Sequence, residues 1–143
     1  MPAPLILLPP SEGKAAGGDG PPWEAAEQSF AALADARREV MAALVDAMGG
    51  SPEARSKLLG VKAARADEAT ETNLAAASAP TMSAIDRYTG VLYDALDYPS
   101  LPAKVRRGVD RQVVIFSGLW GAVRPADPIP DYKLKMGATL PGL

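Results

Sequence analysis

The chain has 143 residues, of which 48% are hydrophobic and 22% charged, and its formal net charge at pH 7 is -2. These proportions are typical of a single globular domain with a hydrophobic core. The absence of cysteine and histidine excludes disulfides, thiolate or imidazole metal ligands and Ser-His-Asp catalysis within this sequence. Any metal site would need oxygen ligands alone, and because the acidic residues are scattered rather than clustered, we predict no metal site and no cofactor.

The hydrophobic stretches are too short for a membrane protein. No run approaches the roughly 18 apolar residues of a transmembrane helix, and the first eight residues lack the basic and apolar regions of a signal peptide. We predict a cytoplasmic protein without a membrane partner. Residues 1–54 carry three basic and eight acidic side chains, whereas residues 98–143 carry seven and three. This asymmetry permits a basic face for a polyanion, although solvated faces explain it equally well.

A short apolar run begins the chain. Residues 5–8 are apolar and end at two prolines, which predicts a buried strand. A glycine-rich loop carrying Lys14 follows, and such loops cradle phosphates when their amides and a lysine face an anion. Ala15 stands where a Walker A loop requires Ser or Thr. The loop is therefore either an anion site of another kind or a flexible surface segment.

The next part of the sequence predicts three helices. An apolar stripe over residues 23–48 indicates one long helix, which two glycines end. Ser51 and Pro52 are an N-cap and a first helical residue for a second helix. It breaks at Gly60, and residues 61–74 form the third.

The break at Gly60 is surrounded by basic residues and resembles a helix-hairpin-helix. In such motifs, backbone amides and basic side chains contact DNA phosphates without reading bases. Lys62 stands where the usual hairpin has a second glycine, and acidic residues follow closely. An ordinary solvated helix pair is the alternative interpretation. The residues that we assign to DNA contact are Lys57, Gly60, Lys62 and Arg65.

The remaining segments alternate between strands and helices. Residues 84–88 fit a strand or a helix start, residues 89–96 and 100–111 predict helices, and residues 112–117 predict a buried strand. Residues 132–136 alternate as a strand with one wet face. The predicted fold class is therefore α/β, with a mixed sheet and surrounding helices.

A dense block follows the strand at residues 112–117. Gly118 and Gly121 permit a positive φ or a close backbone approach, and Arg124 and Asp127 flank a bend at Pro125. The block is either a tight turn with a structural Arg–Asp pair or one wall of a pocket. Polar groups beyond two predicted strands favour a pocket, because open α/β sheets bind ligands there. The candidate pocket residues are Ser11, Gly13, Lys14, Ser117, Arg124, Asp127 and Tyr132.

With these residues in view, the chain resembles the YaaA family of bacterial peroxide-stress proteins. The resemblance is carried by residues 5–14, residues 57–65, and the block of residues 117–127 with 132–137. It implies one YaaA-like domain over residues 1–143, with a helix-hairpin-helix-like segment at 51–78. Family members are longer, so we expect this chain to match their amino-terminal part, with an incomplete carboxyl-terminal end.

The resemblance also implies a function. It points to a cytosolic peroxide-stress protein that protects DNA from oxidative damage, by limiting free iron and by binding double-stranded DNA without sequence specificity. It supplies no catalytic residues, and we expect a non-enzymatic protein. The alternative is an enzyme or a small-anion-binding α/β protein with a Lys/Arg/Asp pocket. The sequence does not predict an oligomeric state.

Overall fold

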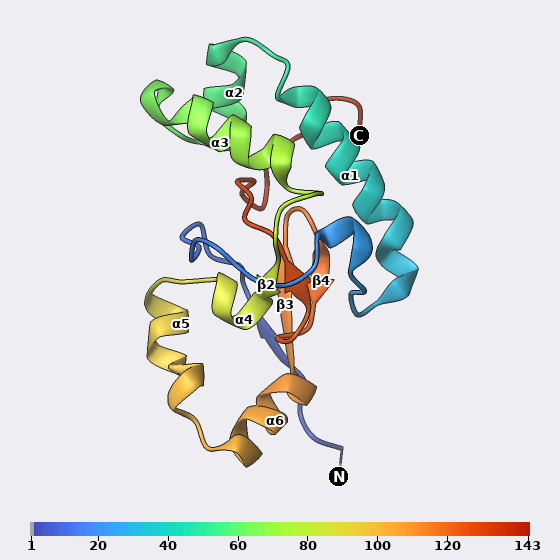
Figure 1. Cartoon of the computed structure of the whole chain (residues 1–143), viewed down its shortest axis with the longest axis vertical. Helices are drawn as coiled ribbons and strands as arrows, with labels where there is room; N and C mark the ends of the chain where they lie inside the picture. The colour runs from blue at the N-terminus through green and yellow to red at the C-terminus, as the bar shows by residue number, and fades with distance from the viewer. Residues whose placement is uncertain (1) are drawn as a thin grey trace.

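The computed structural model describes residues 2–143 and has a small sheet between two groups of helices (Figure 1). Strands β1 (Ile6–Leu8), β3 (Val113–Ser117) and β4 (Gly121–Val123) form the sheet in the order β1-β3-β4. β1 pairs with β3 in parallel, and β3 pairs with β4 antiparallel. Strands β2 (Met82–Ser83) and β5 (Pro128–Ile129) form a separate antiparallel pair. The predicted α/β class with a mixed sheet is confirmed.

The helices gather at the two ends of the molecule. Helices α1 (Ala34–Ala47), α2 (Pro52–Leu59) and α3 (Ala63–Ala75) lie together beside the C-terminus, and α5 (Val91–Leu96) and α6 (Ala103–Gln112) lie at the opposite end (Figure 1). The short α4 (Ala84–Arg87) lies near the sheet. Three single turns of 3-10 helix span Trp23–Ala25, Ala31–Leu33 and Tyr98–Ser100.

The core is built around Trp120, which is fully buried in the turn between β3 and β4. Its ring lies 4.9 Å from that of Trp23 and 5.7 Å from that of Tyr132, measured between ring centroids. Leu44 of α1 and Leu59 of α2 join the same cluster. The aromatic residues therefore connect the sheet to the group of helices α1–α3.

The predicted helix over residues 23–48 is wrong in its first half. Phe30 adopts a left-handed conformation with φ of 59°, which an α-helix cannot contain. Immediately before it, the backbone N–H and hydroxyl of Ser29 donate to the Asp127 carboxylate at 3.1 and 2.8 Å. A contact with a residue almost 100 positions away thus replaces the helical hydrogen bonds, and the regular helix begins only at Ala34.

Two strand predictions also need correction. β1 forms but is not buried, because Leu5, Ile6 and Leu7 are 61%, 44% and 56% exposed at an edge that only β3 covers. Residues 132–136 do not form a strand. Their alternation is nevertheless real, since Tyr132 and Leu134 are buried and the lysines between and after them are not.

The local signals around α2 are confirmed. The Ser51 hydroxyl accepts the N–H of Ala54 at 3.1 Å, Pro52 is the first helical residue, and Gly60 ends the helix with φ of 64°. Residues 84–87, which fitted either a strand or a helix, are helical.

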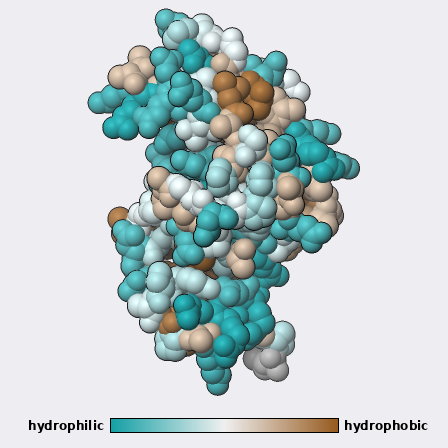
Figure 2. All heavy atoms as spheres, viewed as in Figure 1, coloured by the Kyte–Doolittle hydropathy of each residue, from teal (hydrophilic) through white to brown (hydrophobic). Residues whose placement is uncertain are grey.

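Among the helices of the described part of the chain, none combines the length and the apolar character that a membrane span requires. The face in Figure 2 is largely hydrophilic, with a small hydrophobic patch between α1 and α2.

Candidate functional site: a cavity between the amino-terminal loop and α3

A cavity of about 370 Å³ lies where three segments meet. The loop after β1 contributes Glu12 and Lys14, residues 61–72 line the opposite side, and residues 131–133 line a third. We call this hollow the Lys14 cavity. A second cavity of about 360 Å³ shares Glu12, Lys14, Tyr132 and Lys133 with it. Lys14 therefore stands between two connected depressions.

Lys14 is held in place by its backbone and by two contacts of its ammonium. Its backbone forms an antiparallel bridge with Tyr88. The Nζ atom donates to the carbonyl of Glu12 at 3.1 Å and lies 4.3 Å from the ring centroid of Tyr132, a cation–π distance. No carboxylate in residues 2–143 lies within 4 Å of it. The cation is thus ordered but not neutralised.

Desolvation lowers the pKa of the Lys14 amine from 10.5 to about 8, and Asp131 and Glu12 oppose that shift. At neutral pH the group is therefore still largely protonated, although it is easier to deprotonate than a surface lysine. An amine of this kind can bind an anion or transfer a proton near neutral pH.

The Tyr132 ring, which lies against the Lys14 ammonium, is held in place by hydrogen bonds of its hydroxyl group. The buried Ser117 hydroxyl accepts the N–H groups of Leu119 and Trp120, each at 3.1 Å. It therefore donates its proton to the Tyr132 hydroxyl, 2.9 Å away. The Tyr88 hydroxyl lies 2.6 Å from the same oxygen. Burial raises the pKa of Tyr132 well above 10, so its phenol stays protonated.

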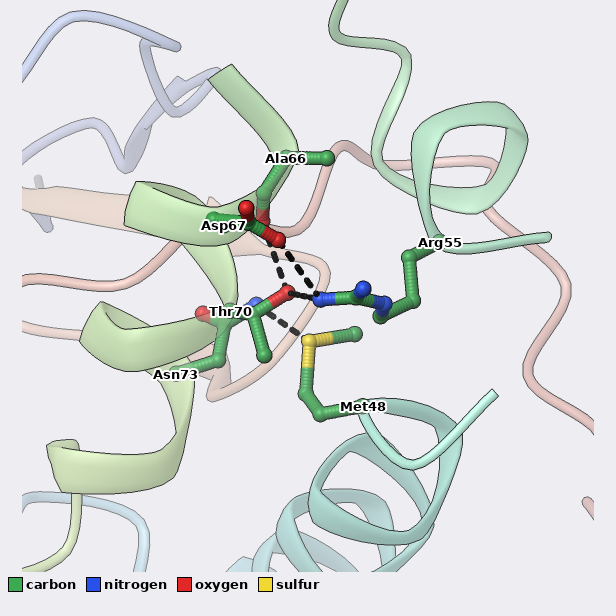
Figure 3. Close-up of polar contacts among 6 residues, drawn as sticks. All are labelled: Met48, Arg55, Ala66, Asp67, Thr70 and Asn73. Carbon is green, nitrogen blue, oxygen red and sulfur yellow. Dashed lines mark hydrogen bonds and ion pairs between the residues drawn. The ribbon is translucent and has the colours of Figure 1, made fainter. Parts of the chain in front are cut away.

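Asn73 fixes the third wall of the cavity. Its side chain, which is fully buried in α3, donates to the Lys133 carbonyl at 2.9 Å and accepts the Lys133 N–H at 2.7 Å. It also contacts the sulfur of Met48 at 3.5 Å (Figure 3). Asn73 thus replaces the neighbouring strand that residues 132–136 lack, and it ties them to α3.

A second polar contact joins α2 to α3. The Arg55 guanidinium donates to the Thr70 hydroxyl at 2.8 Å and lies 3.4 Å from an Asp67 carboxylate oxygen (Figure 3). Thr70 in turn donates to the carbonyl of Ala66 one turn earlier. Arg55 is consequently part of the packing between the helices, whereas Lys62 and Arg65 face the cavity.

The four residues assigned to DNA contact fall into two groups. Lys62 and Arg65 line the Lys14 cavity, whereas Lys57 lines a different groove, together with the end of α1 and residues of the segment 135–141. Gly60 lies at the turn, and a Cβ built there would be 3.1 Å from the Lys135 Nζ atom. The turn therefore carries an additional ammonium, that of Lys135.

The candidate pocket residues also lie in several different places. Lys14 and Tyr132 line the Lys14 cavity, Ser11 lines the adjoining one, and Ser117 lies beneath Tyr132. Gly13 packs against Thr89, since a Cβ there would be 2.8 Å from its hydroxyl.

Arg124 and Asp127 line neither cavity. Asp127 accepts the Arg124 N–H at 2.8 Å in addition to the two Ser29 bonds. The Arg124 guanidinium donates to the Arg111 carbonyl at 2.6 Å and lies 5.3 Å from the Phe30 ring. In this structure Asp127 holds the turn to the segment before α1, and Arg124 joins the turn to the end of α6 while its guanidinium lies over Phe30.

The glycine-rich loop is organised by Arg87, which sequence reasoning did not single out. Its buried guanidinium donates to the carbonyls of Ala15 and Gly17 at 2.8 Å, to Pro80 at 3.3 Å and to Ile129 at 3.2 Å. Burial lowers the pKa of this guanidinium. The loop carbonyls of Ala15 and Gly17 therefore bind the Arg87 guanidinium of the protein itself.

Sequence reasoning assigned no role to Asn73, Lys133 and Asp131, and it treated Glu68 only as one of the acidic residues that oppose phosphate. The alternating pattern of residues 132–136 could have indicated Lys133, because it places that side chain opposite the buried neighbours. A single asparagine within a helix has no comparable signal. In the described part of the chain, no group of three or more Asp or Glu side chains is arranged to hold a metal ion.

Comparison with known proteins identifies the family of the chain and several of its relatives. The model of the family described as "Peroxide stress protein YaaA" matches residues 5–143. A UPF0246 protein of Streptomyces coelicolor is 47% identical over 140 residues, covering 97% of this chain and 53% of that protein. UPF0246 proteins of Corynebacterium glutamicum and Corynebacterium efficiens are 42% and 43% identical, covering 96% of this chain and 53% of each relative. The chain thus spans about half the length of these curated relatives.

Proposed function

The chain belongs to the YaaA family of peroxide stress proteins, and we propose that it protects DNA during peroxide stress by binding double-stranded DNA without sequence specificity. We propose that the protein acts in the cytoplasm, where its DNA partner lies. It treats the protein as a DNA-associated factor rather than as an enzyme.

The observation that carries the proposal is the pair Lys62 and Arg65 directly after the left-handed Gly60. Lys62 is the N-cap residue of α3, and Arg65 lies in the first turn of that helix. In residues 2–143 the ion pairs within 4 Å join other residues, so both cations are free to meet a phosphate. The Lys135 ammonium beside Gly60 adds a third charge at the same turn. Phosphate contacts of this kind give affinity without base readout.

A salt titration of duplex binding tests the proposal. We expect the affinity of the protein for a random 20-base-pair duplex to be independent of sequence and to fall steeply with salt. Replacing Lys62→Glu together with Arg65→Glu should weaken binding at least tenfold and flatten the salt slope by about two phosphate contacts.

The matched control is Lys104→Glu with Arg107→Glu, which makes the same charge change on exposed positions of α6 at the opposite end of the molecule. This variant should bind like the wild type. Unchanged binding by the first double variant would remove the α2–α3 turn from the DNA contact, and loss of binding by the control alone would assign the contact to α6.

Glu68 provides a test in the opposite direction. Its carboxylate lines the cavity one turn along α3 from Arg65, where it repels phosphate. We expect Glu68→Gln to tighten duplex binding two- to fivefold at low salt, an effect typical of one screened charge. Weaker binding would mean that Glu68 supports the site.

We propose in addition that the protein limits free iron during peroxide stress. Iron converts peroxide into hydroxyl radical, so this action would protect the same DNA, and the stress named for the family supports it. Electron paramagnetic resonance of chelated iron in whole cells tests this proposal. It compares a strain that lacks the gene with the same strain after the gene has been restored. Equal signals in the two strains under peroxide would contradict an effect on iron.

A further inference from the structure

The Lys14 cavity has features that duplex binding does not use. A duplex presents a convex row of phosphates, which suits the exposed Lys62 and Arg65. Lys14 is less exposed than either, and it is reached from inside a hollow of about 370 Å³. That volume lies within the range of small-molecule sites, roughly 300–1,000 Å³.

Several cationic side chains line the cavity and carry donors that the described residues do not use. Of the three N–H groups of the Lys14 ammonium, one donates to the Glu12 carbonyl and one side faces the Tyr132 ring. At least one N–H remains without an acceptor in the described residues. Lys62, Arg65 and Lys133 line the same cavity, and none of them is paired with a carboxylate within 4 Å.

The cavity is also preorganised, which distinguishes it from a group of surface lysines. The Tyr132 platform is hydrogen-bonded to the buried Ser117, and the Lys133 backbone is clamped by Asn73. Lys14 itself is fixed by its bridge to Tyr88. A ligand would therefore meet donors whose positions are already set, so that less ordering entropy is lost on binding.

We infer that the Lys14 cavity binds a phosphate monoester of about mononucleotide size, with its phosphate on the Lys14 ammonium. A phosphate monoester carries a charge of about -1.5 to -2 at pH 7 and three strong acceptor oxygens, which matches several unpaired cations better than one carboxylate would. Glu12, Glu68 and Asp131 at the cavity wall accept hydrogen bonds from the hydroxyl or amino groups of the remainder.

Such a phosphate has two sources, a free mononucleotide or the 5′-phosphate at the end of a DNA strand. The second source rests on the duplex binding proposed above, whereas the first is independent of it. In both, the phosphate occupies the same position on Lys14, and the experiment below separates them.

The test is calorimetric titration of the full 143-residue chain with AMP, adenosine and inorganic phosphate, and then with a duplex carrying either 5′-phosphate or 5′-hydroxyl ends. We expect AMP to bind, adenosine to bind at least tenfold more weakly, and Lys14→Met to lose at least tenfold in AMP affinity. Lys104→Met, which removes an exposed lysine on α6, is the matched control and should bind AMP like the wild type.

Arg65→Gln provides a second variant in case Lys14→Met fails to fold, and it should weaken AMP binding as well. If AMP does not bind but the 5′-phosphate duplex binds more tightly than the 5′-hydroxyl duplex, and Lys14→Met abolishes the difference, the strand end is the source. Equal binding of AMP and adenosine, or AMP binding that Lys14→Met and Arg65→Gln leave unchanged, would overturn the site. The site would also be overturned if neither the mononucleotide nor the duplex bound more tightly with its phosphate than without it.

The two proposals fail separately. A protein that binds 5′-hydroxyl duplex through Lys62 and Arg65, but shows no phosphate dependence at Lys14, retains duplex binding and loses this site. A protein that binds AMP but no duplex retains the site and loses the DNA function.

Discussion

Lys14 is a desolvated cation, and we expect it to lower the stability of the fold. The unfolded chain leaves the amine in water with a pKa of 10.5, whereas the folded protein lowers the pKa to about 8. Because the ligand-free fold holds this cation in a desolvated place, the cation destabilises the fold wherever it is charged. We expect an anion bound beside Lys14 to replace the hydration that the ammonium loses on folding.

This gives a prediction for Lys14→Met. Between pH 8 and 10.5 the unfolded chain holds a proton that the folded chain has released, so the free energy of unfolding of the wild type should rise with pH in that window. The variant lacks this contribution, and we expect it to be about 1–2 kcal/mol more stable than the wild type at pH 7, after solvent screening and the lost cation–π contact are taken into account.

Urea unfolding at pH 7 and pH 9.5 checks this prediction, because the advantage of the variant should shrink at the higher pH. Comparing the variant with the wild type at each pH cancels the contributions of other titrating groups, including the buried tyrosines. A variant that is less stable than the wild type at pH 7, or an advantage that grows with pH, would show that Lys14 is not desolvated.

Arg87 is a buried cation of the opposite kind, because its partners are already supplied. It is fully buried and donates to the carbonyls of Ala15, Gly17, Pro80 and Ile129. We expect Arg87→Met to lower the free energy of unfolding by about 3 kcal/mol or more, since four carbonyls lose a charged donor. Arg107→Met, at an exposed position of α6, should change it by less than about 0.5 kcal/mol. Urea denaturation of both variants measures the difference, and similar values for the two would contradict the role of Arg87.

At the scale of elements, the turn between α2 and α3 requires glycine at position 60. Its φ is 64°, and a Cβ would lie 3.1 Å from the Lys135 ammonium. We expect Gly60→Ala to lower the free energy of unfolding by about 1 kcal/mol and to weaken duplex binding by moving Lys135. Gly108→Ala in α6 is the matched control, because nothing lies within 4 Å of its Cβ and alanine favours a helix, so stability should rise by about 0.5–1 kcal/mol. Thermal unfolding measures both changes, and a Gly60→Ala variant as stable as the wild type would show that the turn tolerates a side chain.

The sequence predicted the elements whose signals are local. The N-cap at Ser51, the break at Gly60 and the strand ending at Ser117 depend on neighbouring residues, and all three are confirmed. The predictions that were wrong depended on distant contacts. The bond from Ser29 to Asp127 interrupts the helical pattern near its start, so that the regular helix begins only at Ala34.

The same distinction applies to the site. Lys14, Lys62, Arg65 and Tyr132 were each selected from the sequence, but as parts of two unrelated hypotheses. Their meeting around one cavity depends on how the loop after β1, α3 and residues 131–133 pack, and on the clamp by Asn73. No local pattern encodes that arrangement.

At the scale of the whole molecule, the two groups of helices have different chemistry. The group around α3 carries the cavity, the Gly60 turn and the polar contacts of Figure 3. The opposite end carries α6, whose basic side chains are mostly exposed, whereas the exposed strand β1 belongs to the sheet between the two ends. The sheet connects these ends, since β3 follows α6 directly and ends at Ser117 beneath the cavity.

The exposed β1 leads to a prediction about association. Leu5, just before β1, and Leu7 within it are 61% and 56% exposed, and the outer edge of this strand has no partner in the described residues. Such an edge promotes pairing with another chain. We expect Leu5→Ser with Leu7→Ser to reduce self-association at high protein concentration and to change the free energy of unfolding by less than about 0.5 kcal/mol. Light scattering coupled to size exclusion measures the first effect, and urea unfolding measures the second. Leu44→Ser, in the fully buried core of α1, should instead cost more than about 3 kcal/mol. A comparable loss in the Leu5/Leu7 variant would mean that these side chains are packed rather than exposed.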